Sequence, residues 1–183
     1  ERLGIDKLLS EIGMSENQIK IAQTLLTAKM LHPSSELEAE RWLAENSAAA
    51  EVFETDEKIS RYKLYKVAEQ MYAHKEFIDN SLYSNIKDMF SGRSKIVIFD
   101  LTNMYFEGQM LGSEKANFGR SKQKQKGNKL IGLALSIDSL GFVRYSKFYK
   151  GNVSEPGTFS EMIEDVSQQF SDNSEVPVVV MDA

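Results

Sequence analysis

The spacing of apolar residues changes type at Ser91-Gly92, and this change constrains the fold more than any other feature of the chain. Before it, apolar residues recur at helical spacing; after it, short β-branched runs are separated by turns. The sequence therefore predicts an α+β fold, bordering on α/β, with a helical domain over residues 1–92 and a sheet-containing domain over residues 93–183. A chain of 183 residues is long enough for two small domains.

Four helices are expected in the N-terminal part. Ser15 is placed to cap the first, over about 16–31, and Pro33 ends it because the residue before a proline avoids helical geometry. A second helix is expected over about 36–48. Two more carry apolar stripes whose aromatic residues are expected to pack between helices: Tyr62, Leu64, Tyr65, Val67, Ala68 and Met71, then Phe77, Ile78, Leu82, Tyr83, Ile86 and Phe90.

The C-terminal part is expected to begin with a strand and a β-hairpin. Lys95–Asp100 is a short β-branched run, typical of a buried strand. Residues 129–138 and 142–149 are two further strands, and Ser139-Leu140-Gly141 between them is a short hairpin turn. Asp138 opens that turn, and turn chemistry accounts for it.

A helix and a last strand complete the expected order. Thr158 with Glu161 fits a capping box at the start of a helix, and Val178–Met181 is the last strand. A crossover helix returns the chain parallel to the first strand. Asp100 and Asp182 would then close two neighbouring strands at one edge, where strands about 4.8 Å apart let two carboxylates share a metal ion.

The composition limits which metal such a site could hold. The chain has no cysteine and only two histidines, His32 and His74, to which we assign no chemistry. Thiolate centres and disulfides are therefore excluded, and histidine centres are disfavoured. Carboxylate oxygens suit Mg²⁺ or Mn²⁺, and the sequence does not choose between these two ions.

Charge is strongly segregated along a chain whose net charge is −5. Residues 1–92 hold 11 basic and 16 acidic residues, residues 93–150 hold 11 and 4, and residues 151–183 hold none and 7. This pattern indicates a basic surface beside an acidic pocket. No apolar run approaches the roughly 20 residues of a membrane-spanning helix.

The connection from Leu101 to Asn128 is long for a hairpin and carries the densest basic cluster. Two interpretations stay open: contact with the DNA phosphate backbone near the carboxylates, or a solvated loop. Glu107, in the same connection, is expected to be solvated. The cluster consists of Arg120, Lys122, Lys124, Lys126 and Lys129.

Several motifs in a fixed order resemble the DDE transposases of bacterial insertion sequences, specifically the fourth insertion-sequence family and its longer-protein subgroup. The resemblance covers nearly the whole chain. It is carried by Leu31-His32-Pro33-Ser34-Ser35, Phe99-Asp100-Leu101-Thr102-Asn103-Met104-Tyr105-Phe106-Glu107-Gly108, Phe118-Gly119-Arg120-Ser121-Lys122, Gly132-Leu133-Ala134-Leu135, Tyr149-Lys150-Gly151-Asn152-Val153-Ser154 and Val179-Val180-Met181-Asp182-Ala183.

The resemblance implies a ribonuclease H-like core and an enzyme that cuts transposon ends and joins the 3′-hydroxyl to target DNA. Asp100 and Asp182 match the first two catalytic carboxylates and would bind Mg²⁺ or Mn²⁺. The partners would be double-stranded DNA and a second copy of the chain in the synaptic complex. The location would be the bacterial cytoplasm, at the nucleoid.

This sequence also departs from the family pattern. Gln123 stands where an acidic residue is usual, and the glycine usual after the second aspartate motif is absent. The third carboxylate, a Glu in a Tyr-x-x-Arg-x-x-x-Glu pattern, is expected beyond Ala183. The chain begins without Met and stops on a strand-like run, so we interpret it as an inactive or nearly inactive fragment truncated after the second catalytic aspartate.

Two other functions remain open at this stage. One is a non-catalytic helical module for DNA-end binding or dimerisation, the role expected of residues 1–92, with a degenerate core. The other is an actin-like ATPase, which shares the strand–hairpin–helix order. Such ATPases place a glycine-bearing phosphate turn after the first aspartate, whereas Leu101-Thr102-Asn103 has no glycine.

Overall fold

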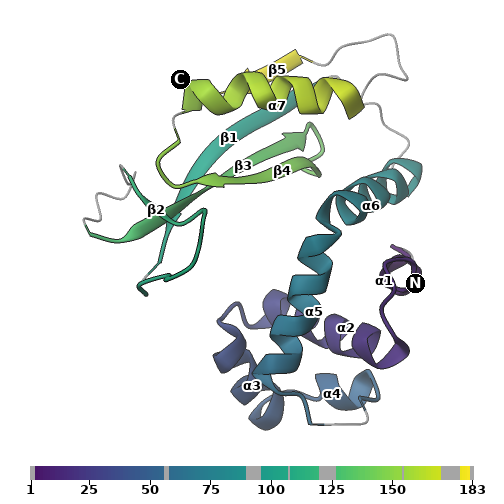
Figure 1. Ribbon diagram of the computed structural model, residues 1–183. Coiled ribbons are helices and arrows are strands. Elements are labelled where there is room, and N and C mark those ends of the chain that lie inside the picture. Colours follow the sequence, from purple (N-terminus) through teal and green to yellow (C-terminus); the bar gives the residue numbers. More distant parts are fainter. Residues whose placement is uncertain are drawn as a thin grey trace. The chain divides into compact units, whose positions relative to one another are not determined.

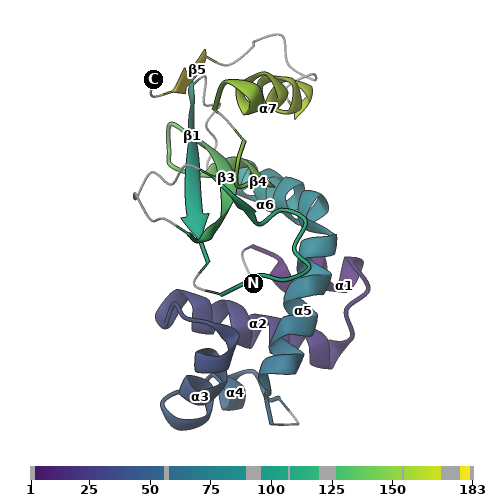
Figure 2. The same ribbon diagram turned by 60° about the vertical axis from the view of Figure 1, so that its left-hand side comes forward.

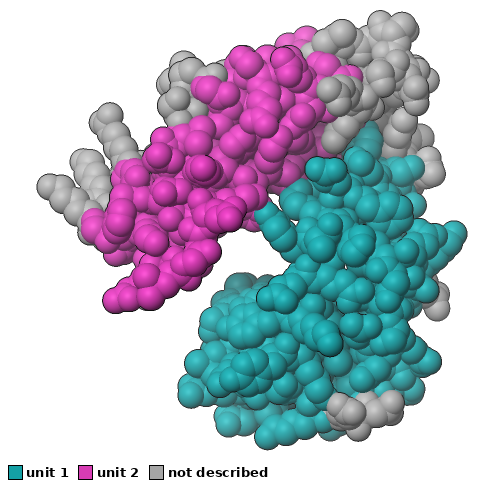
Figure 3. Space-filling view, viewed as in Figure 1, with its two compact units in different colours: residues 1–89 teal, residues 90–183 magenta. Residues whose placement is uncertain are grey.

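The chain divides into two units, Glu1–Met89 and Phe90–Ala183, coloured separately in Figure 3. The structure, a computed structural model, describes residues 3–55, 58–89, 96–106, 108–119, 127–153, 155–169 and 178–181. The first unit is helical, and the second combines a mixed sheet with one long helix (Figure 1). The α+β class is therefore observed. Within the described residues, no helix has both the length and the apolarity needed to cross a membrane.

Six helices are described in the first unit. Ser15 caps α2 through a reciprocal pair: its hydroxyl accepts from the Gln18 backbone N–H, and the Gln18 side chain accepts from the Ser15 N–H. The α2 bounds confirm the prediction, whereas α3 ends before residue 48 and the chain restarts as α4. The elements are α1 Ile5–Glu11, α2 Glu16–Leu31, α3 Glu36–Glu45, α4 Ala49–Val52, α5 Arg61–Ala73 and α6 Lys75–Met89.

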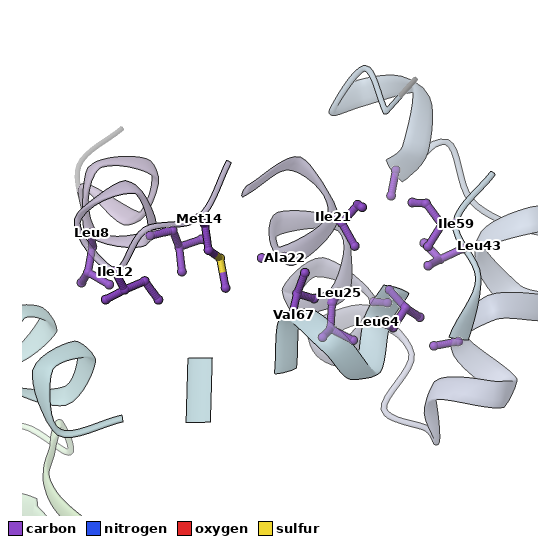
Figure 4. Packing of buried hydrophobic residues seen from close by; sticks show 14 residues of the cluster. Leu8, Ile12, Met14, Ile21, Ala22, Leu25, Leu43, Ile59, Leu64 and Val67 are labelled. Atoms are coloured by element: carbon purple, nitrogen blue, oxygen red, sulfur yellow. The ribbon is translucent and has the colours of Figure 1, made fainter. Parts of the chain in front are cut away.

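The core of this unit is formed by small and branched apolar side chains from α1 to α5 (Figure 4). Ala22, Ala28 and Leu64 are fully buried, and Leu25 and Val67 are nearly so. The alanines on α2 let α5 approach closely, so Leu64 and Val67 fill the space between the two helices.

The aromatic residues of α5 contradict the packing expected from their spacing. Tyr62 is 69% exposed and Tyr65 is 43% exposed, although both belong to the stripe predicted to pack between helices. The buried side of α5 is set by Leu64 and Val67 instead. Apolar residues occur on more than one side of this helix, so periodicity alone could not select the buried side.

The second unit contains a five-stranded mixed sheet (Figures 1 and 2). β1 lies between β3, which is antiparallel to it, and β5, which is parallel to it. β3 and β4 form the expected hairpin, so the hairpin and the parallel return strand are confirmed. The strands are β1 Ile96–Tyr105, β2 Asn117–Phe118, β3 Lys129–Asp138, β4 Val143–Lys150 and β5 Val178–Met181.

Two expected boundaries in this unit are wrong. β1 does not end at Asp100 but continues to Tyr105, because residues 101–105 keep the strand alternation and pair with β3. The last helix, α7 (Glu155–Gln169), begins before Thr158, so Thr158 lies inside the helix rather than at its cap. Thr158 is 1% exposed, which places it in the helix–sheet interface.

One face of the sheet is covered by α7 (Figures 1 and 2). Phe159 of α7 packs its ring against Phe99 of β1, with centroids 6.1 Å apart, and Met162 is fully buried in the same cluster. Side chains alternate between faces along a strand. Phe99 and Leu101 therefore face α7, and Asp100 and Thr102 lie on the opposite face.

Candidate functional site

The parallel pair β1–β5 forms the centre of the candidate site. Its register places Ile98 opposite Val180 and Phe99 opposite Met181. The next residue in the sequence is an aspartate in both cases, Asp100 after Phe99 and Asp182 after Met181. Asp182 itself lies outside the described residues.

Asp100 is an exposed carboxylate in the middle of β1. Its backbone partner across the antiparallel ladder is Leu135. One carboxylate oxygen, Oδ2, accepts a hydrogen bond of 2.9 Å from the hydroxyl of Thr102, two residues along the same face. An acceptor held by a short side chain on a strand has a restricted orientation, which suits a metal ligand.

Sequence reasoning assigned no role to Thr102, although it lies in the motif that carries the resemblance. The signal was available in the spacing: residues i and i+2 of a strand share a face, so Thr102 had to lie beside Asp100 once β1 extended past residue 100. Ending the predicted strand at Asp100 concealed this contact.

Around Asp100 the open sheet face is largely apolar. Ile98 lies before Asp100 on the same face, and Leu133 and Leu135 lie on the neighbouring strand β3. Five apolar side chains of this face are each more than a third exposed: Ile96, Ile98, Met104, Val178 and Val180.

Lys129 is the one member of the basic cluster among the described residues, since Arg120, Lys122, Lys124 and Lys126 lie outside them. It opens β3, pairs with Phe118 of β2, and donates through Nζ to the Met110 carbonyl oxygen at 3.1 Å. Leu135, the partner of Asp100, lies six positions further along β3, which is about 20 Å along a strand. This lysine is therefore far from Asp100 rather than near it.

β2 explains how the basic cluster is attached to the sheet. Leu130 of β3 pairs with Tyr105 of β1 on one side and with Asn117 of β2 on the other. β2 and β4 therefore pair with the same edge of β3, β2 at its start and β4 further along. The Phe118–Lys129 pair closes the segment that carries the cluster. Both ends of that segment are thus fixed to the sheet.

Asp138 serves the hairpin turn, as expected. Its Oδ1 accepts from the backbone N–H groups of Leu140 at 3.0 Å and Phe142 at 2.9 Å, and the residue is 6% exposed. It pairs with Val97 and shares the α7-covered face, so the structure does not bring it together with Asp100. Glu107 lies outside the described residues.

A polar cluster between β4 and α7 was missed by sequence reasoning. The Tyr145 hydroxyl donates to Asp165 Oδ2 at 2.9 Å, and Lys147 Nζ donates to Asp165 at 2.9 Å and to Glu161 at 2.7 Å. Burial, with the hydrogen bonds to Tyr149 and Asp165, raises the pKa of Tyr145. These residues position α7, and only the β4–α7 contact could have revealed them.

Within the described ranges, no group of three or more His, Cys, Asp or Glu residues is arranged to hold a metal ion. Asp100 is the described carboxylate at the β1–β5 edge. A metal site there would need its other ligands from outside those ranges. Asp182 is the candidate, because it follows Met181, which pairs with Phe99, the residue before Asp100. Comparisons of the chain with protein-family models, with curated proteins and with solved structures found no match.

Proposed function

We propose that this protein is a DDE-type DNA transposase, whose Asp100 and Asp182 hold Mg²⁺ or Mn²⁺ for DNA strand cleavage and strand transfer at insertion-sequence ends in a bacterial cytoplasm. The observation that carries the proposal is the parallel β1–β5 register, which sets Phe99 opposite Met181 with an aspartate following each in the sequence. The strand order β4–β3–β1–β5 is also the order of a ribonuclease H-like core.

The donor set fits hard divalent cations. Aspartate oxygens are the ligands that Mg²⁺ and Mn²⁺ prefer. When bound, such an ion lowers the pKa of its water and stabilises charge on a phosphate leaving oxygen. The role of Asp100 is to hold the ion, and the role of Thr102 is to fix the orientation of that carboxylate through its 2.9 Å hydrogen bond.

Double-stranded DNA would extend from this edge toward the basic cluster. Lys129 is about 20 Å along β3 from the level of Asp100, a distance that corresponds to about six base pairs. Residues Arg120 to Lys126 would then contact the phosphate backbone away from the reacting phosphate. Such contacts add affinity without reading sequence.

The observed strand counts against the ATPase alternative. β1 continues for five residues past Asp100, paired with β3 throughout. A phosphate-binding turn directly after the aspartate, as that alternative requires, is therefore replaced by regular strand.

A DNA-binding measurement with and without metal tests the proposal, because two of the three carboxylates used by this class lie within these 183 residues. We expect Mn²⁺ to tighten binding of a duplex of about 30 base pairs by about tenfold relative to chelator, as read by fluorescence anisotropy. Asp100→Asn should abolish this gain, because the amide no longer offers a charged ligand.

Glu164→Gln is the matched control, since it removes one negative charge from an exposed position on α7 in the same unit. It should keep the full Mn²⁺ effect. If Mn²⁺ leaves the affinity of the wild-type chain unchanged while DNA still binds, the catalytic proposal fails and the non-catalytic DNA-binding module becomes the better account.

A further inference from the structure

The exposed side of α5 carries aromatic side chains that core packing does not explain. Tyr62 is 69% exposed and Tyr65 is 43% exposed, while Leu64 and Val67 on the other side of the helix are buried in the core. Two neighbouring tyrosines on the solvent-facing side of a helix stabilise less than buried ones, because a large part of each side chain stays in water. Their position therefore points to a partner.

Basic residues are concentrated around these tyrosines. The segment 58–66 holds four basic residues and no acidic one, although residues 1–92 as a whole hold 11 basic against 16 acidic residues. Arg61 and Lys63 lie in the first turn of α5, where the helix dipole favours acidic side chains. Helix stability thus does not account for this charge, whereas attraction of an anion does.

Helix geometry brings four of these side chains to one side of α5. Residues spaced by three and four positions neighbour each other on a helix. Arg61, Tyr62, Tyr65 and Lys66 therefore form one surface, which we call the α5 basic–aromatic face. The Arg61 guanidinium lies 5.0 Å from the Tyr62 ring centroid and donates to the Tyr62 hydroxyl at 3.2 Å.

The charge of this face is available to a ligand. Lys66 is exposed and makes no hydrogen bond or ion pair with any part of the chain that the structure describes. Two acidic neighbours reduce the positive charge of the face but do not cancel it. Glu69 follows one turn later on α5. Glu40 of α3 is close enough to raise the pKa of Arg61, after the larger effect of Tyr62. From Arg61 to Lys66 the face spans about one and a half helical turns, or about 8 Å along the axis.

We propose that the α5 basic–aromatic face binds the sugar–phosphate backbone of duplex DNA, as a second contact besides the basic cluster of the sheet unit. Arg61 and Lys66 supply the cations, and Tyr62 and Tyr65 supply hydroxyl and ring contacts to the backbone. The four basic residues of segment 58–66, with no acidic residue among them, favour a polyanion such as nucleic acid as the partner. The partner rests on the proposed function, but the contact needs no metal.

The test is the salt dependence of DNA binding by the whole chain in the presence of chelator. A duplex of about 30 base pairs is titrated between about 50 and 200 mM salt and followed by fluorescence anisotropy. The double variant Arg61→Gln/Lys66→Gln should bind about tenfold more weakly and reduce the slope of log affinity against log salt by about 2, because two phosphate contacts are lost. Tyr62→Ala/Tyr65→Ala should weaken binding with an unchanged slope.

Lys7→Gln/Arg41→Gln is the matched control. Both side chains are exposed in the same unit, and the charge change is identical. Their ion pairs with Glu11 and Glu38 are of the weak surface kind. This control should keep the wild-type slope, and all variants should show the wild-type circular dichroism spectrum because none of the substituted side chains is buried.

A slope for Arg61→Gln/Lys66→Gln equal to that of the control would overturn the proposal. So would a change in self-association by sedimentation with unchanged DNA affinity, which would make the face a protein–protein interface. Because chelator is present throughout, failure here is separate from failure of the metal-dependent function, which is read from the Mn²⁺ effect at Asp100.

Discussion

Gly151 marks the closest approach of three backbone segments in the sheet unit. Its N–H donates to the Lys115 carbonyl oxygen at 3.1 Å, and a Cβ at this position would collide with the Leu130 carbonyl. A Cβ at Gly119 would in turn collide with the Gly151 carbonyl. These contacts fix the base of the segment that carries the basic cluster, so the glycines serve the candidate DNA contact through backbone packing.

Replacing Gly151 by alanine should therefore destabilise the sheet unit. The added methyl group meets backbone that cannot move without breaking strand pairing, so we expect a loss of about 1–3 kcal/mol in the free energy of unfolding, measured by urea denaturation. Gly108→Ala is the control, because nothing lies within 4 Å of a Cβ there. Equal stability of the Gly151 variant and the control would contradict the close packing.

Between α7 and the sheet, hydrophobic contacts and a polar cluster act together. Met162 and Phe159 pack in one cluster with Phe99, while Tyr145 and Asp165 join β4 to α7. Burial raises the pKa of Tyr145, and its hydrogen bonds act in the same direction. For Lys147, burial alone would lower the pKa, but hydrogen bonds to acidic residues of α7 outweigh it and the pKa is raised.

Tyr145→Phe should change the pH dependence of stability. The unfolded chain loses the Tyr145 proton near its ordinary pKa of 10.0, whereas the folded chain retains it, so the stabilisation is present below pH 10 and decreases as the pH rises above that value. The variant should lose about 1 kcal/mol at pH 7 and show a shallower decrease above pH 10, by at most about 1.4 kcal/mol per pH unit.

Urea unfolding at several pH values checks this, with Tyr72→Phe as a control at a half-exposed position of α5. The control should reproduce the wild-type decrease above pH 10. A Tyr145→Phe decrease as steep as that of the wild type would show that this tyrosine does not contribute to alkaline unfolding.

Sequence signals that act over a few residues predicted those helices and strands whose bounds depend on nearby residues alone. Ser15 as N-cap and Pro33 after the last turn predicted the bounds of α2, and β3 and β5 also match their predicted ranges, because caps, turns and β-branched runs act within a few residues. The end of β1 and the start of α7 were wrong because pairing with β3 and burial of Thr158 against the sheet decided them.

The candidate site was predictable in part for the same reason. The parallel β1–β5 pairing follows from element order, so the neighbourhood of Phe99 and Met181 could be expected from the sequence. The Thr102 contact and the distance of Lys129 from Asp100 depend on how far β1 and β3 extend, and a strand ending at Asp100 could not yield them.

The two units of the molecule divide the proposed work between them. The sheet unit would hold the metal through Asp100 and Asp182 and contact DNA through its basic cluster, while the helical unit would contact the backbone through α5. The acidic balance of the helical unit restricts that second contact to one small face, which agrees with the concentration of basic residues in segment 58–66.

The central claim is that Asp100 and Asp182 bind one divalent ion together, and titration with Mn²⁺ followed by electron paramagnetic resonance tests it most directly. Asp100→Asn and Asp182→Asn should each weaken binding by about tenfold or more, and the double variant should bind about as weakly as either one, because both ligands serve the same ion. Additive losses, or full affinity in either single variant, would contradict a shared metal site.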